Sequence, residues 1–186
     1  MVEQEIINEC WRSVSEYENY QVSNIGRVRN VSTSRILKPD IRDGYYQVKL
    51  YQNKITKTHK IHKLVANEFL IKPDTDDKLI IDHINRNRTD NQITNLRWAS
   101  YAQNNWNVGN RTNTMSKYKG VSFHNKSWRA RISNNGNDLN IGYFSTEKEA
   151  AKAYNNKVKE LRDEYSCVNE ISDSESDNES DDKSDA

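Results

Sequence analysis

Short apolar runs, each bounded by turn residues, make up most of the first 57 residues. They lie at 11–14, 20–23, 26–31, 36–38 and, after the turn at Asp43 and Gly44, at 45–51. Alternation of apolar with polar residues and enrichment in β-branched and aromatic residues are typical of strands. We therefore expect one small antiparallel sheet in this part of the chain.

The next segment changes from the period of a strand to that of a helix. Residues 59–72 carry apolar side chains at helical spacing, which predicts an amphipathic helix that begins near His62 and ends by Pro73. Two short apolar runs follow, at 79–82 and 95–98, with a polar loop between them. Ser100 and Gln103 have the spacing of a capping box, so a short helix should begin at Ser100.

The last third of the chain repeats the strand pattern and then ends in a helix. Strands are expected at 120–124, 128–133 and 139–144, joined as hairpins. Thr146 and Glu149 form a second capping box, which predicts a helix that runs to about Arg162. The apolar face of this helix must be buried, and we expect it to pack on the three-stranded sheet. Alternation along 128–133 turns Trp128, Ala130 and Ile132 toward that helix and leaves the arginines on the other face.

These patterns predict an α+β protein made of several modules. We place an N-terminal β domain at 1–57, a second module at 58–108, a linker at 109–116 and a module with three strands and one helix at 117–171. Residues 172–186 are rich in Asp, Glu and Ser and cannot bury enough apolar surface to fold, so we expect a disordered acidic tail.

The formal net charge of +1 hides a basic body. Residues 170–186 hold eight acidic residues and one lysine, and the rest of the chain has 27 basic and 19 acidic residues. This balance favours a polyphosphate partner. Two distant cysteines, no long apolar run and no secretory signal pattern predict a soluble intracellular protein without a membrane partner.

The polar loop between the runs at 79–82 and 95–98 carries the candidate chemistry. Asp82, His83, Asn91, Asn95 and Asn104 are spread over it and over the helix that follows. Hydrolysis of a phosphodiester needs a group that takes a proton from water and a positive charge near the phosphate. A histidine suits the first task, and a divalent ion held by oxygen ligands suits the second.

The string IDHINRNRTDNQITNLRWASYAQNN resembles the core of HNH nucleases, in particular the homing endonucleases of mobile introns and phages. The resemblance implies a β-hairpin packed on a helix, called the ββα-metal motif, and one divalent ion, magnesium or else manganese, with no zinc. It further implies that His83 is the general base, that Asp82 and Asn104 are metal ligands, and that Asn95 orients the loop and the imidazole. Asn105 is an alternative to Asn104. His59 and His62 are interpreted as structural or phosphate-contacting residues.

Residues 10–51 resemble the nuclease-associated modular domain that often precedes HNH cores, through CWRSVSEYENYQVSNIGRVRN, RILKP and GYYQVKLY. The resemblance implies a DNA-contacting module. Arg27 and Arg29 lie on one strand face and are candidate phosphate contacts. We interpret Trp11, Tyr17 and Val22 as core residues.

Residues 118–170 resemble the DNA-binding domain of plant ethylene-response factors, through YKGVSF, WRARI, IGYFSTEKEAAKAYNNKVKELR and CVNEI. The resemblance implies that the outer sheet face enters the major groove. The candidate DNA contacts are Lys119, Lys126, Arg129, Arg131 and Asn140. Asn140 stands where the plant family usually has tryptophan, so the plant target sequence does not carry over.

Together these features predict a metal-dependent DNA endonuclease of the HNH homing type, with double-stranded DNA as its partner and no obligate protein partner. The combination suits a mobile element, active in a bacterial cytoplasm or, for a virus, in the cytoplasm or nucleus of its host. Two alternatives stay open: a DNA-binding regulator built on a silent nuclease scaffold, and a nuclease that acts on RNA or on particular structures.

Overall fold

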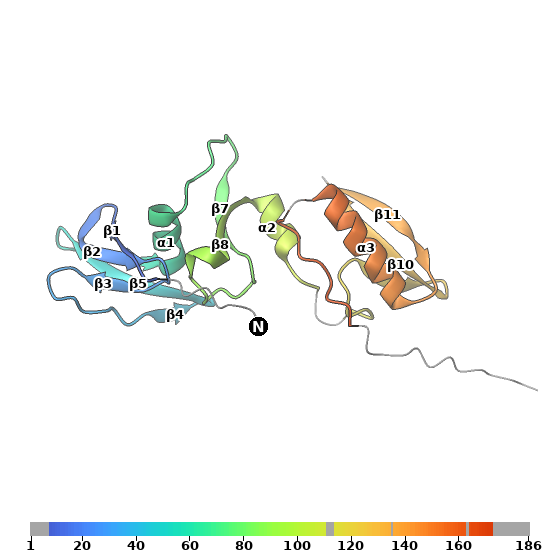
Figure 1. Ribbon diagram of the computed structural model, residues 1–186, viewed down its shortest axis with the longest axis horizontal. Helices are drawn as coiled ribbons and strands as arrows, with labels where there is room; N and C mark the ends of the chain where they lie inside the picture. Colours follow the sequence, from blue (N-terminus) through green and yellow to red (C-terminus); the bar gives the residue numbers. More distant parts are fainter. Residues whose placement is uncertain (1–7, 111–113, 135, 163, 173–186) are drawn as a thin grey trace, which may run out of the picture. The chain divides into compact units, whose positions relative to one another are not determined.

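The computed structural model describes residues 8–110, 114–134, 136–162 and 164–172. The chain divides into two compact units between Val108 and Gly109. The described part is a mixed α/β structure with several small antiparallel sheets and three α-helices (Figure 1). The expected disordered tail lies almost entirely outside the described residues, as does the middle of the expected linker. In the described part, no helix is long and apolar enough to cross a membrane.

The first unit contains two three-stranded sheets where the sequence predicted one. The first sheet has the order β1 (Trp11–Val14), β2 (Tyr17–Ser23), β3 (Val28–Asn30), and the second has the order β4 (Asp40–Arg42), β5 (Tyr45–Gln52), β6 (Ile55–Lys60). The prediction missed β4 and β6 because their side chains are mostly exposed and show no apolar alternation. They are strands because their backbones pair with β5. The strand predicted at 36–38 is wrong, since only Ile36 forms an isolated bridge, with Arg29.

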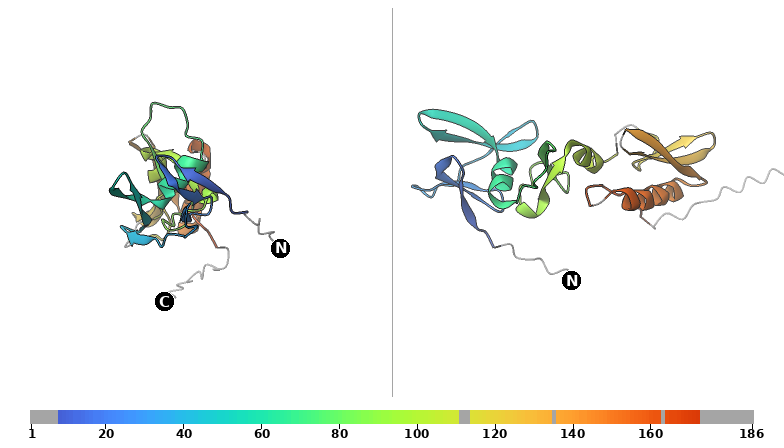
Figure 2. Two further views of the ribbon diagram at one scale, coloured as in Figure 1. Left: turned by 90° about the vertical axis from the view of Figure 1, so that its left-hand side faces the viewer. Right: turned by 90° about the horizontal axis from the view of Figure 1, so that it is seen from above.

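Helix α1 (Ile61–Phe69) lies against strands of both sheets (Figure 2). The prediction of a helix beginning near His62 is confirmed, and the helix ends before Pro73. Its apolar face joins the two sheets into one core with Leu96 of the following hairpin. The buried members of this core are Val14, Tyr17, Val22, Val28, Val48, Leu50, Ile61, Leu64, Val65 and Leu96. Burial of this apolar surface is the main stabilising contribution to the unit.

A hairpin and a short helix complete the first unit. Strand β7 (Leu79–His83) pairs antiparallel with β8 (Leu96–Ser100), and the loop between them contains the 3-10 turn η1 (Ile93–Asn95). Helix α2 (Tyr101–Asn107) follows directly. The capping box predicted at Ser100 is present, with both of its hydrogen bonds to Gln103. This strand, loop, strand and helix order is the ββα arrangement that the sequence led us to expect.

The second unit is a three-stranded sheet covered on one face by a helix. Strands β9 (Val121–His124), β10 (Ser127–Asn134) and β11 (Asn137–Phe144) have β10 in the centre, and α3 (Glu147–Leu161) packs on all three. The capping box at Thr146 and Glu149 is confirmed. Ala130 and Ile132 are fully buried beneath α3, as their alternation predicted.

Candidate active site

Asp82 and His83 end strand β7 and are both buried, with 4% and 5% of their surface exposed. Asp82 lies opposite Arg97 on β8. The Nε and Nη2 atoms of Arg97 are each 2.9 Å from Oδ2 of Asp82, which makes a buried, charged hydrogen-bonded pair. The carboxylate is therefore held in one orientation at the point where the strand gives way to the loop.

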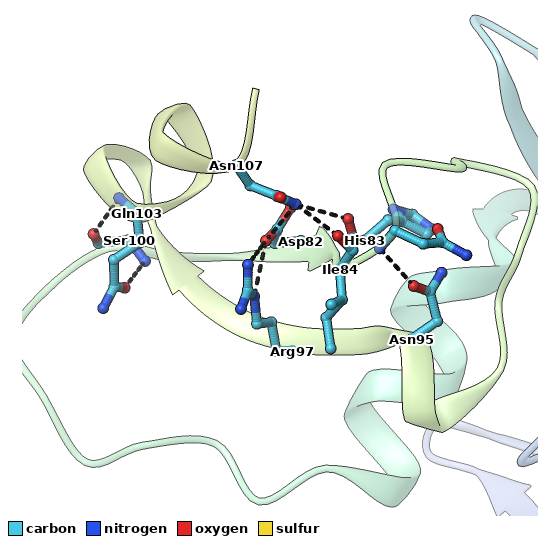
Figure 3. Close-up of polar contacts among 9 residues, drawn as sticks. Asp82, His83, Ile84, Asn95, Arg97, Ser100, Gln103 and Asn107 are labelled. Atoms are coloured by element: carbon cyan, nitrogen blue, oxygen red, sulfur yellow. Dashed lines mark hydrogen bonds and ion pairs between the residues drawn. The ribbon is translucent and has the colours of Figure 1, made fainter. Parts of the chain in front are cut away.

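Asn107, the last residue of α2, is a site residue that the sequence analysis missed. Its Nδ2 atom lies 3.1 Å from each carboxylate oxygen of Asp82, 2.9 Å from the carbonyl oxygen of His83 and 3.3 Å from that of Ile84 (Figure 3). Four oxygen atoms thus surround one amide nitrogen. The amide links the end of the helix to the end of β7. It also marks a point where four oxygen atoms, all hydrogen-bond acceptors, converge.

The two asparagines considered as metal ligands differ in their position on α2. Asn104 is half-buried and lies three residues before Asn107, which places the two on the same helix face. Asn105 is exposed, and residues two positions apart do not share a face. A spacing of three residues on a helix was the signal in the sequence that would have led from Asn104 to Asn107 as a further site residue.

The donors around Asp82 fit a hard divalent cation. They are the carboxylate oxygens of Asp82 and the backbone carbonyl oxygens of His83 and Ile84, ligand types that Mg²⁺ and Mn²⁺ prefer. Among the residues the structure describes, no three side chains of His, Cys, Asp or Glu form a metal-binding group. A cation held here would therefore draw on Asp82 together with amide or backbone oxygens.

The imidazole of His83 is held between Asn91 and His62. Its Nε2 atom is 3.2 Å from Oδ1 of Asn91, and its ring meets the ring of His62 edge-on at 5.0 Å between centroids. Burial lowers the pKa of His83, an effect that the Asn91 hydrogen bond and Asp82 oppose. A lowered pKa keeps the imidazole neutral and able to accept a proton near neutral pH.

A second buried histidine and two cations border this ring. His62 is 4% exposed, and burial, then His83, lowers its pKa to about 3. Its ring lies 4.9 Å from that of Tyr45, and Tyr45 in turn is approached by Lys60 Nζ at 4.0 Å and Arg88 Cζ at 5.1 Å from its centroid. The rings of Tyr45 and His83 are 6.1 Å apart between centroids, so Lys60 and Arg88 place positive charge one ring away from the imidazole, where it favours a phosphate.

Asn95 fixes the loop but does not bond the imidazole. Its Oδ1 accepts from the backbone N–H of Asn85 at 2.9 Å, and its Nδ2 donates to the carbonyl of Asp90 at 2.8 Å. It thereby clamps both ends of the segment 85–90. The residue that hydrogen-bonds the ring of His83 is Asn91, which the sequence singled out without giving it a role.

The arginines of the first sheet are engaged within the protein. Arg27 forms an ion pair with Glu9, and both Nε and Nη2 of Arg29 donate to Oε1 of Gln21. The guanidinium of Arg29 stacks over the ring of Trp11 at 4.2 Å. Trp11 is half-buried and outside the apolar core, so its interpretation as a core residue is wrong because the arginine, not the core, covers it.

The DNA-contact candidates of the second unit lie on or near the sheet face that α3 leaves uncovered. Arg129 alternates with the buried Ala130, and its Nε atom is buried without a hydrogen-bond partner among the described residues. Arg131 pairs with Asp138 at 3.1 Å, but both side chains are more than half exposed. Asn140 faces Arg131 across the strands, and Lys126 lies exposed in the β9–β10 turn. Lys119 is half-buried. Its backbone N–H donates to Oδ1 of Asn169, and its carbonyl oxygen accepts from Nδ2 of the same residue.

Comparison with known proteins shows which families two segments of the chain resemble. Residues 61–106 match the HNH endonuclease family, and residues 9–51 match the NUMOD4 motif. Over these two segments the chain is thus similar to HNH endonucleases and to the NUMOD4 motif. Asp82, His83, Asn95 and Asn104 all lie within the HNH match.

Its relatives come from a phage and a giant virus. The chain is 37% identical over 92 residues to the DNA endonuclease I-HmuI of Bacillus phage SP01, which covers 48% of this chain and 52% of that protein. It is 34% and 37% identical over 94 and 100 residues to the uncharacterized HNH endonucleases L245 and L247 of Acanthamoeba polyphaga mimivirus, covering 28% and 25% of those proteins. The chain thus spans about half or less of the length of the curated relatives it matches.

A solved structure is also similar in part. Its subject is DNA binding and cleavage by the HNH homing endonuclease I-HmuI, with 36% sequence identity and a TM-score of 0.47. The similarity covers 51% of this chain and 55% of that one.

Proposed function

We propose that this protein is a metal-dependent DNA endonuclease of the homing type that hydrolyses phosphodiester bonds. The observation that carries the proposal is the pairing of a buried carboxylate, Asp82, with a buried neutral histidine, His83, at the end of one strand in an HNH region. The relatives named as DNA or HNH endonucleases support the same activity. The whole protein would belong to a mobile element of a phage or large virus and act in the cytoplasm of a bacterial host, or in the cytoplasm or nucleus of a viral host.

His83 acts as the general base. Its depressed pKa leaves a neutral imidazole, which takes a proton from the water that attacks the phosphorus atom. The cations Lys60 and Arg88, gathered on Tyr45 beside it, hold the phosphates of the scissile strand. Asn95 keeps the loop in the shape that presents the base.

Asp82 and Asn104 hold the divalent ion, with magnesium as the first choice and manganese as the second. Asp82 supplies a fixed carboxylate, and Asn104 lies on the face of α2 that Asn107 turns toward Asp82. When bound, such an ion neutralises charge that develops on the phosphate. Asn105 is the weaker candidate because it is exposed on a different face.

The decisive experiment is cleavage of supercoiled plasmid that carries DNA from the source genome, with and without Mg²⁺. His83→Ala should lose cleavage by about 10²- to 10⁴-fold, the range for loss of a general base, while DNA binding in a gel-shift assay is retained. His59→Ala is the matched control, since His59 bonds the hydroxyl of Tyr17 at 3.0 Å and lies outside the contacts of Asp82 and His83.

The rival reading is a DNA-binding regulator that keeps a nuclease scaffold without activity. It predicts binding without cleavage at any metal concentration, in wild type and in His83→Ala alike. Equal loss of binding and cleavage in His83→Ala would instead show that the imidazole serves folding or docking, and the assignment of a base would fail.

The second unit binds DNA through the outer face of its sheet. This part of the proposal rests on Arg129 and Arg131, two cations on the face opposite α3, of which Arg129 has a buried, unpartnered Nε. Such residues contact phosphates or base edges in the major groove. Lys119, Lys126 and Asn140 would extend the contact surface, whereas Arg27 and Arg29 must first leave Glu9 and Gln21.

Removal of the two arginines tests this surface. Arg129→Ala with Arg131→Ala should weaken DNA binding. The plot of the logarithm of the association constant against the logarithm of the salt concentration should become less steep by about 1 to 2. The control removes the same charge from the other side of the unit, by Lys152→Ala with Lys159→Ala on exposed positions of α3. If the helix variant lost as much affinity as the sheet variant, the sheet face would not be the binding surface.

A further inference from the structure

Asn91 determines which ring nitrogen of His83 carries the proton. It is 4% exposed, its Oδ1 lies 3.2 Å from Nε2 of His83, and its Nδ2 donates to the carbonyl of Thr89 at 3.3 Å, which fixes the orientation of the amide. An amide oxygen only accepts hydrogen bonds, so Nε2 must be the protonated nitrogen. The lone pair that can take a proton is then on Nδ1.

The other side of Asn91 rests on a turn of the first sheet. Gly26, in the turn between β2 and β3, has φ +84°, and a Cβ atom built there would lie 2.8 Å from Cβ of Asn91 and 3.2 Å from its carbonyl oxygen. Only glycine allows this approach and this backbone conformation together. The backbone of Gly26 therefore packs directly against Asn91 and limits where Asn91 can lie.

The same turn is fixed to the loop by a backbone hydrogen bond. The N–H of Ile93 donates to the carbonyl of Asn24 at 2.8 Å. The side chain of Asn24 in turn accepts from the N–H of Cys10 at 2.9 Å. The turn is thus bonded to the loop two residues after Asn91, and its own shape is held by the contact with Cys10.

We infer that the turn at residues 23–27, within the NUMOD4 match, is a positioning element for the catalytic base. It holds Asn91, and Asn91 holds His83 in the Nε2–H tautomer with Nδ1 directed to the attacking water. The inference rests on the proposed function in so far as His83 is the base. It gives the N-terminal motif a role in the chemistry in addition to any contact with DNA.

The tautomer can be read without metal, DNA or turnover, from the side-chain ¹⁵N chemical shifts of His83. Wild type should show the Nε2–H form alone. Asn91→Ala should give a mixture of both tautomers, and Asn91→Asp, which also offers an acceptor, should restore the single form. In cleavage assays, kcat should fall at least about tenfold in Asn91→Ala with KM little changed, and Asn91→Asp should recover most of it.

Two glycine variants then test the contribution of the turn. Gly26→Ala should shift the ¹⁵N signals of His83 and lower kcat. Gly136→Ala is the control, since Gly136 has φ +80° and thus a similar backbone penalty, but a Cβ there meets nothing within 4 Å. Equal effects of the two would show that backbone strain alone is responsible and would overturn the role of the turn.

The outcomes separate this inference from the proposed function. A single unchanged tautomer in Asn91→Ala overturns the positioning role, whatever the activity of the enzyme. A changed tautomer with an unchanged cleavage rate supports the positioning contact and counts against His83 as the base. A changed tautomer with a reduced kcat, recovered in Asn91→Asp, supports both.

Discussion

Replacement of His62 by phenylalanine should make the first unit less sensitive to acid. His62 is buried against the rings of Tyr45 and His83, and its Nδ1 has no hydrogen-bond partner among the described residues. Phenylalanine keeps the ring contacts and removes the titrating group. Its effect on stability should therefore depend on pH.

The magnitude follows from the pKa of His62, which is about 3 in the folded protein and 6.5 in the unfolded chain. Between these values the unfolded chain binds a proton that the folded protein does not. The contribution of His62 to stability is thus complete above pH 6.5 and is lost as the pH falls from 6.5 toward 3. Between pH 7.5 and pH 5.0 the loss is about 2 kcal/mol, and His62→Phe should lack it.

The assay is urea unfolding at both pH values, followed by amide NMR signals of the first unit so that the second unit does not contribute. The quantity compared is the change in the free energy of unfolding between pH 7.5 and 5.0. His124→Phe, a change at an exposed histidine of the second unit, should behave as wild type. The same pH dependence in His62→Phe and wild type would refute the argument that burial keeps this imidazole neutral.

Three further variants test the fold and the site. Leu50→Ala empties a fully buried position of the first core and should lower the free energy of unfolding by about 2 to 5 kcal/mol in urea titrations. Asn107→Ala removes the donor to the buried carboxylate of Asp82 and should cost about 1.5 to 3 kcal/mol, with faster amide hydrogen exchange at the end of α2. Thr146→Ala removes the capping box of α3 and should destabilise the second unit by about 1 kcal/mol, measured by thermal unfolding. Unchanged stability in any of them would contradict the contact concerned.

The sequence predicted those features correctly that depend on residues close together in the chain. Both capping boxes were predicted from three-residue spacing, and the position of Asp82 and His83 at the end of a strand followed from the apolar run before them. The strand β6 was missed because its side chains face solvent, and its existence depends on backbone pairing with β5 that no side-chain pattern records.

The asparagines of the site show the limit of spacing arguments. The loop and α2 contain many asparagines, and each is a plausible turn former or ligand by residue type alone. Whether Asn91 reaches His83, and whether Asn107 reaches Asp82, depends on how the helix and the first sheet pack around the hairpin. For Asn91 the packing includes the close approach at Gly26, between residues more than sixty positions apart.

The shared core of the first unit determines how large a segment of this chain can be transplanted into another protein. Ile61, Leu64, Val65 and Leu96 belong to the HNH match, yet they are buried against side chains such as Val22 and Leu50 from the preceding sheets. A graft that carried only residues 58–108 to a new DNA-reading partner would expose that apolar surface to water. The smallest transplantable cassette is therefore the whole unit up to Val108.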